Sequence, residues 1–271
     1  MAVRGPLLLV GCGKMGGAML RGWLQRGMRA SDVTVVEPNA TPLADLAAQG
    51  VAVVDDASRL PSGLAPAVVV LAVKPQMTDA ALPAYRRFAK PETVFLSIVA
   101  GRTIGYLERS FGDVAVVRSM PNTPAAVGRG ITVACPNGRV TPVQRAACDE
   151  LLAAVGEVAW VADEGLLDAV TAVSGGGPAY VFLLIECLAE AGVAAGLPAA
   201  LAMRLARVTV SGAGELARQS AEPASVLRQN VTSPAGTTLE ALKILMAPDG
   251  LQPLFTKAIA AATRRSRELA G

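Results

Sequence analysis

The stretch Leu7-Leu8-Leu9-Val10-Gly11-Cys12-Gly13-Lys14-Met15-Gly16 decides the fold of this chain. Its apolar start is typical of a buried strand, and the glycines that follow have the spacing G-x-G-x-x-G. Two such glycines let the backbone turn tightly and approach a pyrophosphate, and the third lets strand and helix pack closely. The helix that begins here also points its positive end at the phosphates. Dinucleotide binding is therefore preferred over a merely structural turn, with the cofactor-binding residues Gly11, Cys12, Gly13, Lys14, Met15 and Gly16.

Short apolar runs alternate with helical stretches over residues 1–162. The expected strands are Leu7–Val10, Val33–Val36, Val51–Val54, Val68–Val73, Val94–Ile98, Val114–Arg118, Ile131–Ala134 and Val158–Val161. The expected helices are Met15–Gln25, Thr41–Gln49, a segment through Leu82 and Phe88, Ile104–Ser110 and Pro142–Val155. Continuously apolar strands suit a parallel sheet covered on both faces. The pattern predicts an α/β domain with a doubly wound sheet of the Rossmann type.

The strand signal disappears after Asp163. The helices expected from there on are Gly165–Val173, Tyr180–Ala195, Ala199–Leu216, Ala224–Gln229, Leu239–Met246 and Leu251–Leu269. Gly- and Pro-containing segments separate several of them. Residues 163–271 are therefore predicted to form a strongly apolar all-α domain, as expected of a helical domain that dimerises.

The amino-acid composition limits the kinds of partner that this chain is expected to bind. Hydrophobic residues make up 52% of the 271 residues and charged residues only 17%, so we expect a homodimer or a higher homo-oligomer. Aromatic residues are 4% and the basic residues form no block, which argues against nucleic acid. The apolar start is too short for a signal peptide, and Glu186 and Glu190 interrupt the most apolar later run, so we expect a cytoplasmic protein without a membrane span.

The chain contains no histidine, which excludes His-based acid–base chemistry and most catalytic zinc sites. Its four cysteines, Cys12, Cys135, Cys148 and Cys187, form no Cys-x-x-Cys pair, and no metal site is expected. Isolated thiols of this kind are usually small core residues in a reducing compartment.

Glu37 closes the second expected strand, at about the distance from the glycine turn where a ribose-binding acid is expected. A carboxylate there accepts both ribose hydroxyls and repels a 2′-phosphate, which favours NADH. A solvated strand-end Glu would admit either cofactor, and the neighbouring Pro38, Asn39 and Thr41 could build a loop that tolerates phosphate. NADPH and NADH therefore both stay open.

Three further loops follow buried strands, at the edge where ligands of such sheets bind. Their candidate cofactor-binding residues are Ala72, Val73, Lys74, Pro75, Val99, Ala100 and Asn122. Lys74 is equally explained as a surface lysine, and the loop of Asn122 as a plain turn fixed by prolines. Three edge loops together are stronger support than any one of them.

A late loop, Asn230–Thr238, precedes the apolar-periodic run Leu239–Leu245. Free backbone N–H groups and small hydroxyls at a helix N-terminus can hold a carboxylate without Arg or Lys. Thr237 and Thr238 are also explained as helix caps. Glu164 could bind a protonated ring nitrogen or cap its own helix, and the Gly-rich segment Ser174–Tyr180 is best explained as a joint between helices.

The chain resembles the pyrroline-5-carboxylate reductase family through almost its whole length. The matching segments are Gly11–Gly16, Ala72–Gln76, Ser97–Gly101, Arg118–Pro124, Ser174–Tyr180 and Val231–Thr238. The last is the most specific, because Ser-Pro-x-Gly-x-Thr before such a helix is the family's signature. The resemblance implies a Rossmann domain, a helical dimerisation domain, NAD(P)H and reduction of 1-pyrroline-5-carboxylate to L-proline. It places Glu164, Asn230, Thr237 and Thr238 at the substrate.

Three positions depart from the family pattern. Ser is frequent where Gly176 stands and Gly where Ala235 stands, and both exchanges are between small residues. The family often carries Ser, Thr or Asn where Glu37 stands, so Glu37 speaks against its usual NADPH preference.

Reduction of a cyclic imine needs a hydride on carbon and a proton on nitrogen. The imine is basic enough to arrive protonated, which fits a chain without histidine. We expect the amides of Gly236, Thr237 and Thr238 to hold the carboxylate and the Thr238 hydroxyl, as the catalytic group, to meet the ring nitrogen. One alternative is a two-domain dehydrogenase of the β-hydroxyacid type, although Lys243 and Lys257 are poorly placed for its catalytic lysine. Another is a non-catalytic dinucleotide-sensing scaffold.

Overall fold

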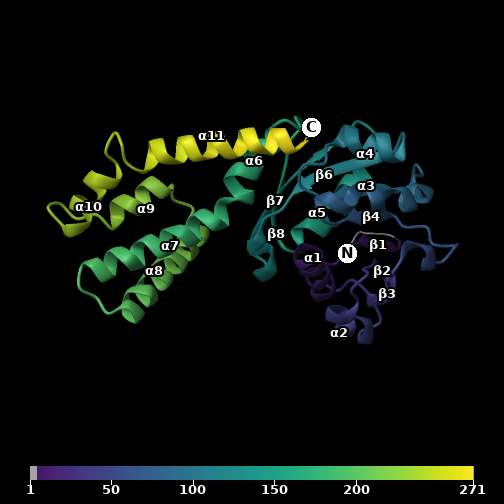
Figure 1. Cartoon of the computed structure of the whole chain (residues 1–271), viewed down its shortest axis with the longest axis horizontal. Helices are drawn as coiled ribbons and strands as arrows, with labels where there is room; N and C mark the ends of the chain where they lie inside the picture. Colours follow the sequence, from purple (N-terminus) through teal and green to yellow (C-terminus); the bar gives the residue numbers. More distant parts are fainter. Residues whose placement is uncertain (1–4, 271) are drawn as a thin grey trace. The chain divides into compact units, whose positions relative to one another are not determined.

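The computed structural model describes residues 5–270 and contains two compact units. The first runs as far as Gly175 and also includes the chain from Thr263 on, and the second is Gly176–Ala262 (Figure 1). Residues 163–175 and the end of the chain thus fold with the first unit. The boundary predicted near Ala162 marks the change from strands to helices in the sequence, whereas the two compact units are separated by their contacts. The predicted boundary therefore stays a prediction.

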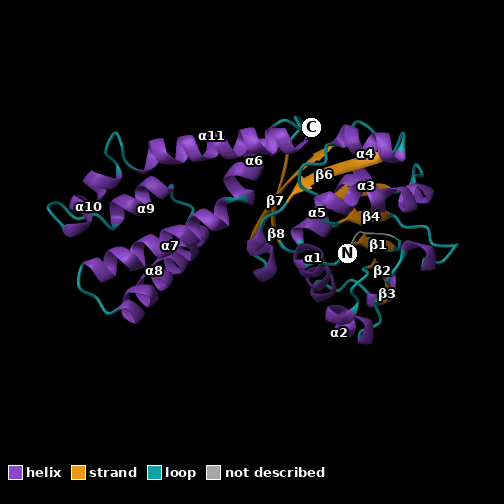
Figure 2. Cartoon of the chain, in the orientation of Figure 1, coloured by secondary structure: helices purple, strands orange, loops and turns teal. Residues whose placement is uncertain are grey.

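The first unit is built on one sheet with the strand order β3-β2-β1-β4-β5-β6-β7-β8 (Figure 2). The strands are β1 Leu7–Val10, β2 Val33–Val36, β3 Ala52–Val54, β4 Val68–Leu71, β5 Val94–Ser97, β6 Ala115–Met120, β7 Gly130–Pro136 and β8 Gly156–Trp160. The chain passes from β1 outward to β3 and then returns to β4 on the other side of β1. This reversal is the switch point at which doubly wound sheets bind ligands. The predicted α/β fold with a doubly wound sheet is confirmed.

One strand pair departs from the expected parallel sheet. β7 runs antiparallel to β6, whereas the other neighbouring strands are parallel. The connection between β6 and β7, residues 121–129, contains only a short 3₁₀ turn, Thr123–Val127. A parallel crossover needs a dozen or more residues, so this connection returns the chain in the opposite direction.

Helices cover both faces of the sheet. They are α1 Lys14–Gln25, α2 Ala44–Ala48, α3 Thr78–Ala81, α4 Ile104–Phe111, α5 Pro142–Ala153 and α6 Leu166–Val170. Alternate residues of β1 enter two separate cores: Leu7 and Leu9 pack with Trp23, whereas Leu8 and Val10 pack with Phe95. The helix expected through Leu82 and Phe88 is instead a 3₁₀ segment, Leu82–Phe88, with a proline near its start.

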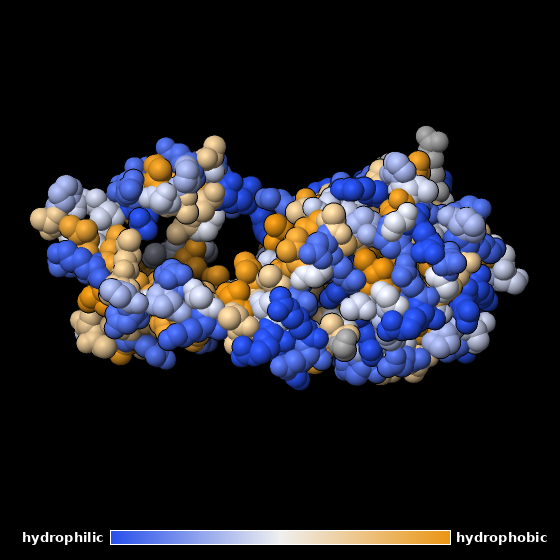
Figure 3. Space-filling view, turned by 90° about the horizontal axis from the view of Figure 1, so that it is seen from above, coloured by the Kyte–Doolittle hydropathy of each residue, from blue (hydrophilic) through white to orange (hydrophobic). Residues whose placement is uncertain are grey.

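The second unit contains α7 Gly177–Ala194, α8 Ala199–Gln219, α9 Ala224–Asn230, α10 Thr237–Leu245 and the first part of α11 Leu251–Ala270. Many of its large apolar side chains are exposed, among them Phe182 at 61% and Val208 at 63%. Figure 3 shows orange, hydrophobic surface on this unit, at the left of the view. An apolar surface of this extent is expected to meet another subunit.

The segment Leu166–Ala194 is long and apolar enough to cross a membrane by length and composition, with 11% of its most apolar window buried. Glu186 and Glu190 therefore do not exclude a span by that measure, contrary to the expectation from the sequence. A helix whose apolar face meets a second subunit has the same composition.

Candidate active site

The glycine turn is shaped by close packing on one side and is open on the other. A Cβ on Gly11, whose φ is +85°, would lie 2.8 Å from the Ala72 carbonyl oxygen. A Cβ on Gly16 would lie 2.6 Å from the carbonyl oxygen of Gly11. These two glycines are required by the fold itself, whereas a Cβ on Gly13 would meet no described atom within 4 Å. The open side at Gly13 leaves room for a ligand to approach the backbone.

Helix α1 begins directly after Gly13, and its 12 residues direct a full helix dipole toward this open side. Its first amides are orphan donors, since they have no partner within the helix. A pyrophosphate fits these features, because it needs close backbone approach, amide donors and positive potential. Lys14 is exposed and Met15 half-buried at the first two positions of the helix.

Cys12 lies within the turn but is unsuited to thiol chemistry. Burial, with a smaller contribution from the carboxylate of Glu37, raises the pKa of its thiol to about 11. The thiol therefore stays protonated near neutral pH and acts as a small apolar residue. Its backbone N–H is the functional part, since it donates to Oε2 of Glu37 at 2.8 Å.

The ends of β4 and β5 supply two neighbouring loops. The Ala72 amide donates to the Val10 carbonyl at 2.8 Å, which fixes the loop after β4 against the glycine turn. Lys74 and Pro75 that follow are exposed, and Val73 is half-buried. In the loop after β5 Val99 is buried at 3% exposure, so its side chain serves the core, whereas Ala100 is exposed.

Arg102 joins these two loops, a role that sequence reasoning missed. Its Nη2 donates to the Pro75 carbonyl at 3.1 Å and to Oδ2 of Asp79 at 3.0 Å. The guanidinium also lies 4.4 Å from the centre of the Tyr106 ring. The hydroxyl of Tyr106 donates to Asp79 at 2.6 Å, which completes the cluster.

Asn122 is engaged by the protein on both sides of its amide. Its Oδ1 accepts the Ile131 amide at 2.9 Å, and its Nδ2 donates to the Ser174 carbonyl at 3.2 Å. These bonds tie the loop after β6 to β7 and to the end of the π-helical turn Thr171–Gly175. The turn continues from α6 toward α7 and places Ser174-Gly175 at the joint between the two helices.

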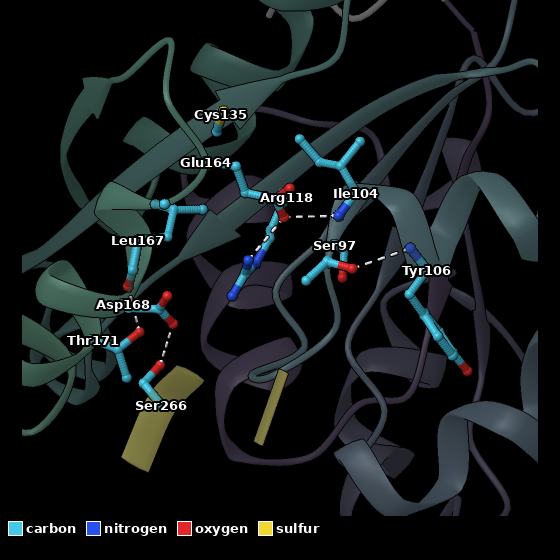
Figure 4. A network of polar contacts seen from close by, with 12 residues as sticks. Ser97, Ile104, Tyr106, Arg118, Cys135, Glu164, Leu167, Asp168, Thr171 and Ser266 are labelled. Atoms are coloured by element: carbon cyan, nitrogen blue, oxygen red, sulfur yellow. Dashed lines mark hydrogen bonds and ion pairs between the residues drawn. The ribbon is translucent and has the colours of Figure 1, made fainter. Parts of the chain in front are cut away.

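Glu164 does not cap its own helix in this structure. Its Oε1 accepts the amide of Ile104, the first residue of α4, at 2.7 Å and forms an ion pair with Nη1 of Arg118 at 2.8 Å (Figure 4). Arg118 is 6% exposed and directly follows the buried apolar residues Ala115–Val117 of β6. A single arginine in an apolar strand was the signal that could have identified this partner.

A second polar contact anchors the end of α11. The hydroxyl of Ser266 donates to Oδ1 of Asp168 at 2.7 Å, and both residues are 9% exposed (Figure 4). Nearby, a Cβ on Gly101 would lie 3.1 Å from the Leu269 carbonyl oxygen. The last turns of α11 therefore pack beside the loop that follows β5.

The late loop in the second unit leads into α10 through a strained residue. Ala235 has φ +59° and is the only non-glycine residue with positive φ among residues 5–270. The amide of Gly236 donates to the Ser233 carbonyl at 3.1 Å, so it is turned back into the loop, unlike the expectation that it faces a ligand. The amides of Thr237 and Thr238, by contrast, begin α10 and have no acceptor in the described part of the chain.

Thr237 and Thr238 are exposed, and neither side chain caps the helix. Asn230 ends α9 and donates from Nδ2 to Oε2 of Glu222 at 3.3 Å. The structure thus brings the expected cofactor residues and Glu164 together in the first unit. The remaining substrate candidates, Asn230 and the Gly236–Thr238 segment, gather in the second.

Comparison with known proteins adds the family context. Residues 164–269 match the family model for pyrroline-5-carboxylate reductase dimerisation, and residues 7–101 match that for NADP oxidoreductase, coenzyme F420-dependent. The chain is 39% identical over 266 residues to the pyrroline-5-carboxylate reductase of Pseudomonas aeruginosa, with 97% of this chain and 96% of that protein covered.

Two solved structures are similar along nearly the whole chain. A pyrroline-5-carboxylate reductase from Coxiella burnetii has a TM-score of 0.91 at 33% identity, covering 98% of this chain and 99% of that one. The pyrroline carboxylate reductase of Plasmodium falciparum with NADP bound has a TM-score of 0.82 at 27% identity, covering 99% of each chain.

Proposed function

Since this chain belongs to the pyrroline-5-carboxylate reductase family, we propose that it reduces 1-pyrroline-5-carboxylate to L-proline with a reduced nicotinamide dinucleotide. The observation that carries the proposal is the presence of two complementary binding features in one chain. One is the glycine turn that is open at Gly13, and the other is the exposed N-terminus of α10.

The reaction adds a hydride to the carbon of the protonated imine, and the nitrogen keeps that proton as the N–H of the ring amine. When bound, the nicotinamide supplies the hydride, and the chain positions both partners. The glycine turn and the start of α1 hold the pyrophosphate by backbone donors. The exposed loops after β4 and β5 lie at the carboxyl edge of the sheet, where a dinucleotide extends in this fold. Lys74, Pro75 and Ala100 are the exposed residues there that line it.

The start of α10 binds the substrate carboxylate in this proposal. The amides of Thr237 and Thr238 donate to it, aided by the positive end of a nine-residue helix. The Gly236 amide is left out of this role because Ser233 already accepts its hydrogen. The Thr238 hydroxyl meets the ring nitrogen and orients the imine.

Glu164 acts near the substrate through its negative charge. Its Oε1 already accepts from Arg118 and from Ile104, so Oε2 is the oxygen left for a cationic ring nitrogen. Asn230, at the end of α9, also contacts the substrate in this proposal, since it directly precedes the loop that leads into α10.

The working form is a homodimer or a larger assembly of dimers, and it acts in the cytoplasm. The exposed apolar side chains of α7 and α8 support subunit contact, since they are too numerous for a stable monomer surface. The family model that matches this half is one for dimerisation.

A β-hydroxyacid dehydrogenase is not favoured. It would need a catalytic lysine on a helix of the second half, and Lys243 is exposed and bound to Glu240 at 2.7 Å. A dinucleotide-sensing scaffold would not need the unpartnered donors at the start of α10.

The test is an absorbance assay of 1-pyrroline-5-carboxylate with each reduced nucleotide. Wild-type protein should consume the nucleotide and form L-proline in equal amounts. Thr238→Val removes the hydroxyl at constant shape and should lower kcat/KM tens-fold, in line with roughly 1–3 kcal/mol for one aligned hydrogen bond. Thr238→Ser keeps the hydroxyl and should restore most of the rate. No consumption with either nucleotide would reject the activity, and an unchanged rate in the Val variant would reject the role of Thr238.

A further inference from the structure

Within the proposed function, the choice between NADH and NADPH falls to the residues at the carboxyl end of β2. The two nucleotides differ by a 2′-phosphate on the adenosine ribose. In doubly wound folds a strand-end carboxylate accepts the ribose hydroxyl, whereas a nearby arginine accommodates the phosphate. The position and charge surroundings of Glu37 therefore decide which nucleotide fits.

Strand register places Glu37 beside the glycine turn. Val10 of β1 is paired with Val36 of β2, and the Gly11 amide donates to the Val36 carbonyl at 2.9 Å. The Glu37 carboxylate then accepts the Cys12 amide on Oε2 at 2.8 Å and the Asn39 amide on Oε1 at 3.1 Å. Two backbone donors thus fix a negative charge at the mouth of the turn.

Further acidic residues lie at the same, carboxyl, ends of the strands. β3 is parallel to β2, with Val54 paired to Val36, and the Glu37 amide donates to the Val54 carbonyl at 3.0 Å. Asp55 and Asp56 come directly after Val54, the residue whose carbonyl accepts the Glu37 amide. Like charges at this edge disfavour an added phosphate.

Arg59 and Arg21, which flank this region, are already paired with carboxylates. No Lys or Arg occurs between Glu37 and Arg59 in the sequence, and Arg59 forms an ion pair with Asp55 at 3.1 Å. Arg21 on α1 donates to both oxygens of Asp45, at 2.5 and 3.2 Å. To bind either guanidinium group, a 2′-phosphate would have to displace the carboxylate that already holds it.

We propose that Glu37 makes this chain prefer NADH over NADPH. The carboxylate accepts the ribose hydroxyls and repels the phosphate, and no unpaired guanidinium compensates in the segment from β2 to β3. The chain thereby departs from the Plasmodium falciparum relative, whose structure holds NADP, and from the NADP oxidoreductase description of the matching family model. This proposal rests on the proposed function, because it assumes that a nicotinamide dinucleotide occupies the glycine turn.

The experiment measures the Kd of NADH and of NADPH by nucleotide fluorescence, without substrate. Wild-type protein should bind NADH at least tenfold more tightly. Glu37→Gln keeps an oxygen for the Cys12 amide but removes the charge, so it should tighten NADPH binding about tenfold while NADH binding changes by no more than a few-fold. Asp55→Asn should shift the ratio in the same direction by less.

Glu157→Gln is the matched control, because Glu157 is an exposed residue of β8 at the opposite edge of the sheet. It should leave the ratio of the two Kd values unchanged. Wild-type protein that binds NADPH as tightly as NADH overturns the proposal, even if Glu37→Gln fails to fold. Failure to bind either nucleotide would instead count against the proposed function, so the two failures are distinguishable.

Discussion

Arg118 and Glu164 are joined by a hydrogen-bonded ion pair of 2.8 Å that links β6 to the segment before α6. The same carboxylate oxygen receives the first amide of α4, so one atom connects three elements of the first unit. The side chain of Arg118 is 7% exposed and that of Glu164 is 28% exposed. The buried arginine therefore depends on this carboxylate for its compensation.

Glu164→Gln should destabilise the first unit, since it leaves the Arg118 charge buried without a counter-charge. The expected loss is about 3 kcal/mol, typical of breaking one side of a buried pair. Arg118→Met with Glu164→Gln should lose less than the sum of the two single variants, because the pair is removed together. Thermal and urea unfolding of the four proteins would measure this, and strictly additive losses would contradict the coupling.

Arg102→Met should weaken the cofactor site without affecting the substrate loop. The change removes the bridge from the loop after β5 to the Pro75 carbonyl and to Asp79. We expect the KM for the reduced nucleotide to rise several-fold, with the KM for the imine nearly unchanged. Arg109→Met serves as the control, since Arg109 is exposed on the adjoining α4. Equal effects of the two variants would remove the positioning role of Arg102.

Ala235→Gly should stabilise the second unit. The left-handed conformation costs an L-residue about 1–2 kcal/mol, and the added flexibility of glycine offsets part of the gain, leaving about 0.5–1 kcal/mol. Ala241→Gly, in the interior of α10, should act in the opposite direction by about 1 kcal/mol. Denaturation midpoints should rise in Ala235→Gly and fall in Ala241→Gly. A lower midpoint in Ala235→Gly would show that the φ of +59° at Ala235 is not strained.

Alkaline pH should destabilise the protein through its buried thiols. Burial raises the pKa of Cys12 to about 11 and that of Cys148 to about 12, from an ordinary value of 9.0. Above pH 9 the unfolded chain loses these protons first, so the free energy of unfolding falls as pH rises toward 11. Unfolding midpoints from pH 8 to pH 11 should decline less steeply in Cys12→Ala than in wild type. Parallel pH profiles would assign the decline to other groups.

Local sequence signals predicted the parts of the fold that depend on neighbouring residues. The glycine turn and the apolar strands are of this kind, because their patterns have a single good structural solution. The antiparallel direction of β7 follows from the short connection between β6 and β7, residues 121–129, which is also visible in the sequence. The family resemblance found the segment around Thr238, and the structure added that the Gly236 amide faces inward.

Contacts between distant residues could not be predicted in the same way. Arg118 and Glu164 are 46 residues apart, and Asp168 and Ser266 are 98 apart. The apolar period of a helix is the same whichever unit it packs against, so the sequence of α11 predicted a helix but not its return to the first unit. Such pairings depend on the tertiary arrangement and carry no short-range pattern.

The return of α11 means that the chain leaves the first unit after Gly175 and re-enters it at Thr263. The helical unit is thus an insertion, with both of its ends tethered to the same body. A protease that cuts one tether would leave the two units covalently joined through the other. Removal of the last turns, by contrast, would free one tether and abolish the Ser266–Asp168 contact in the same step. A tag or fusion at the C-terminus is therefore attached to the nucleotide-binding body, although it follows the helical unit in the sequence.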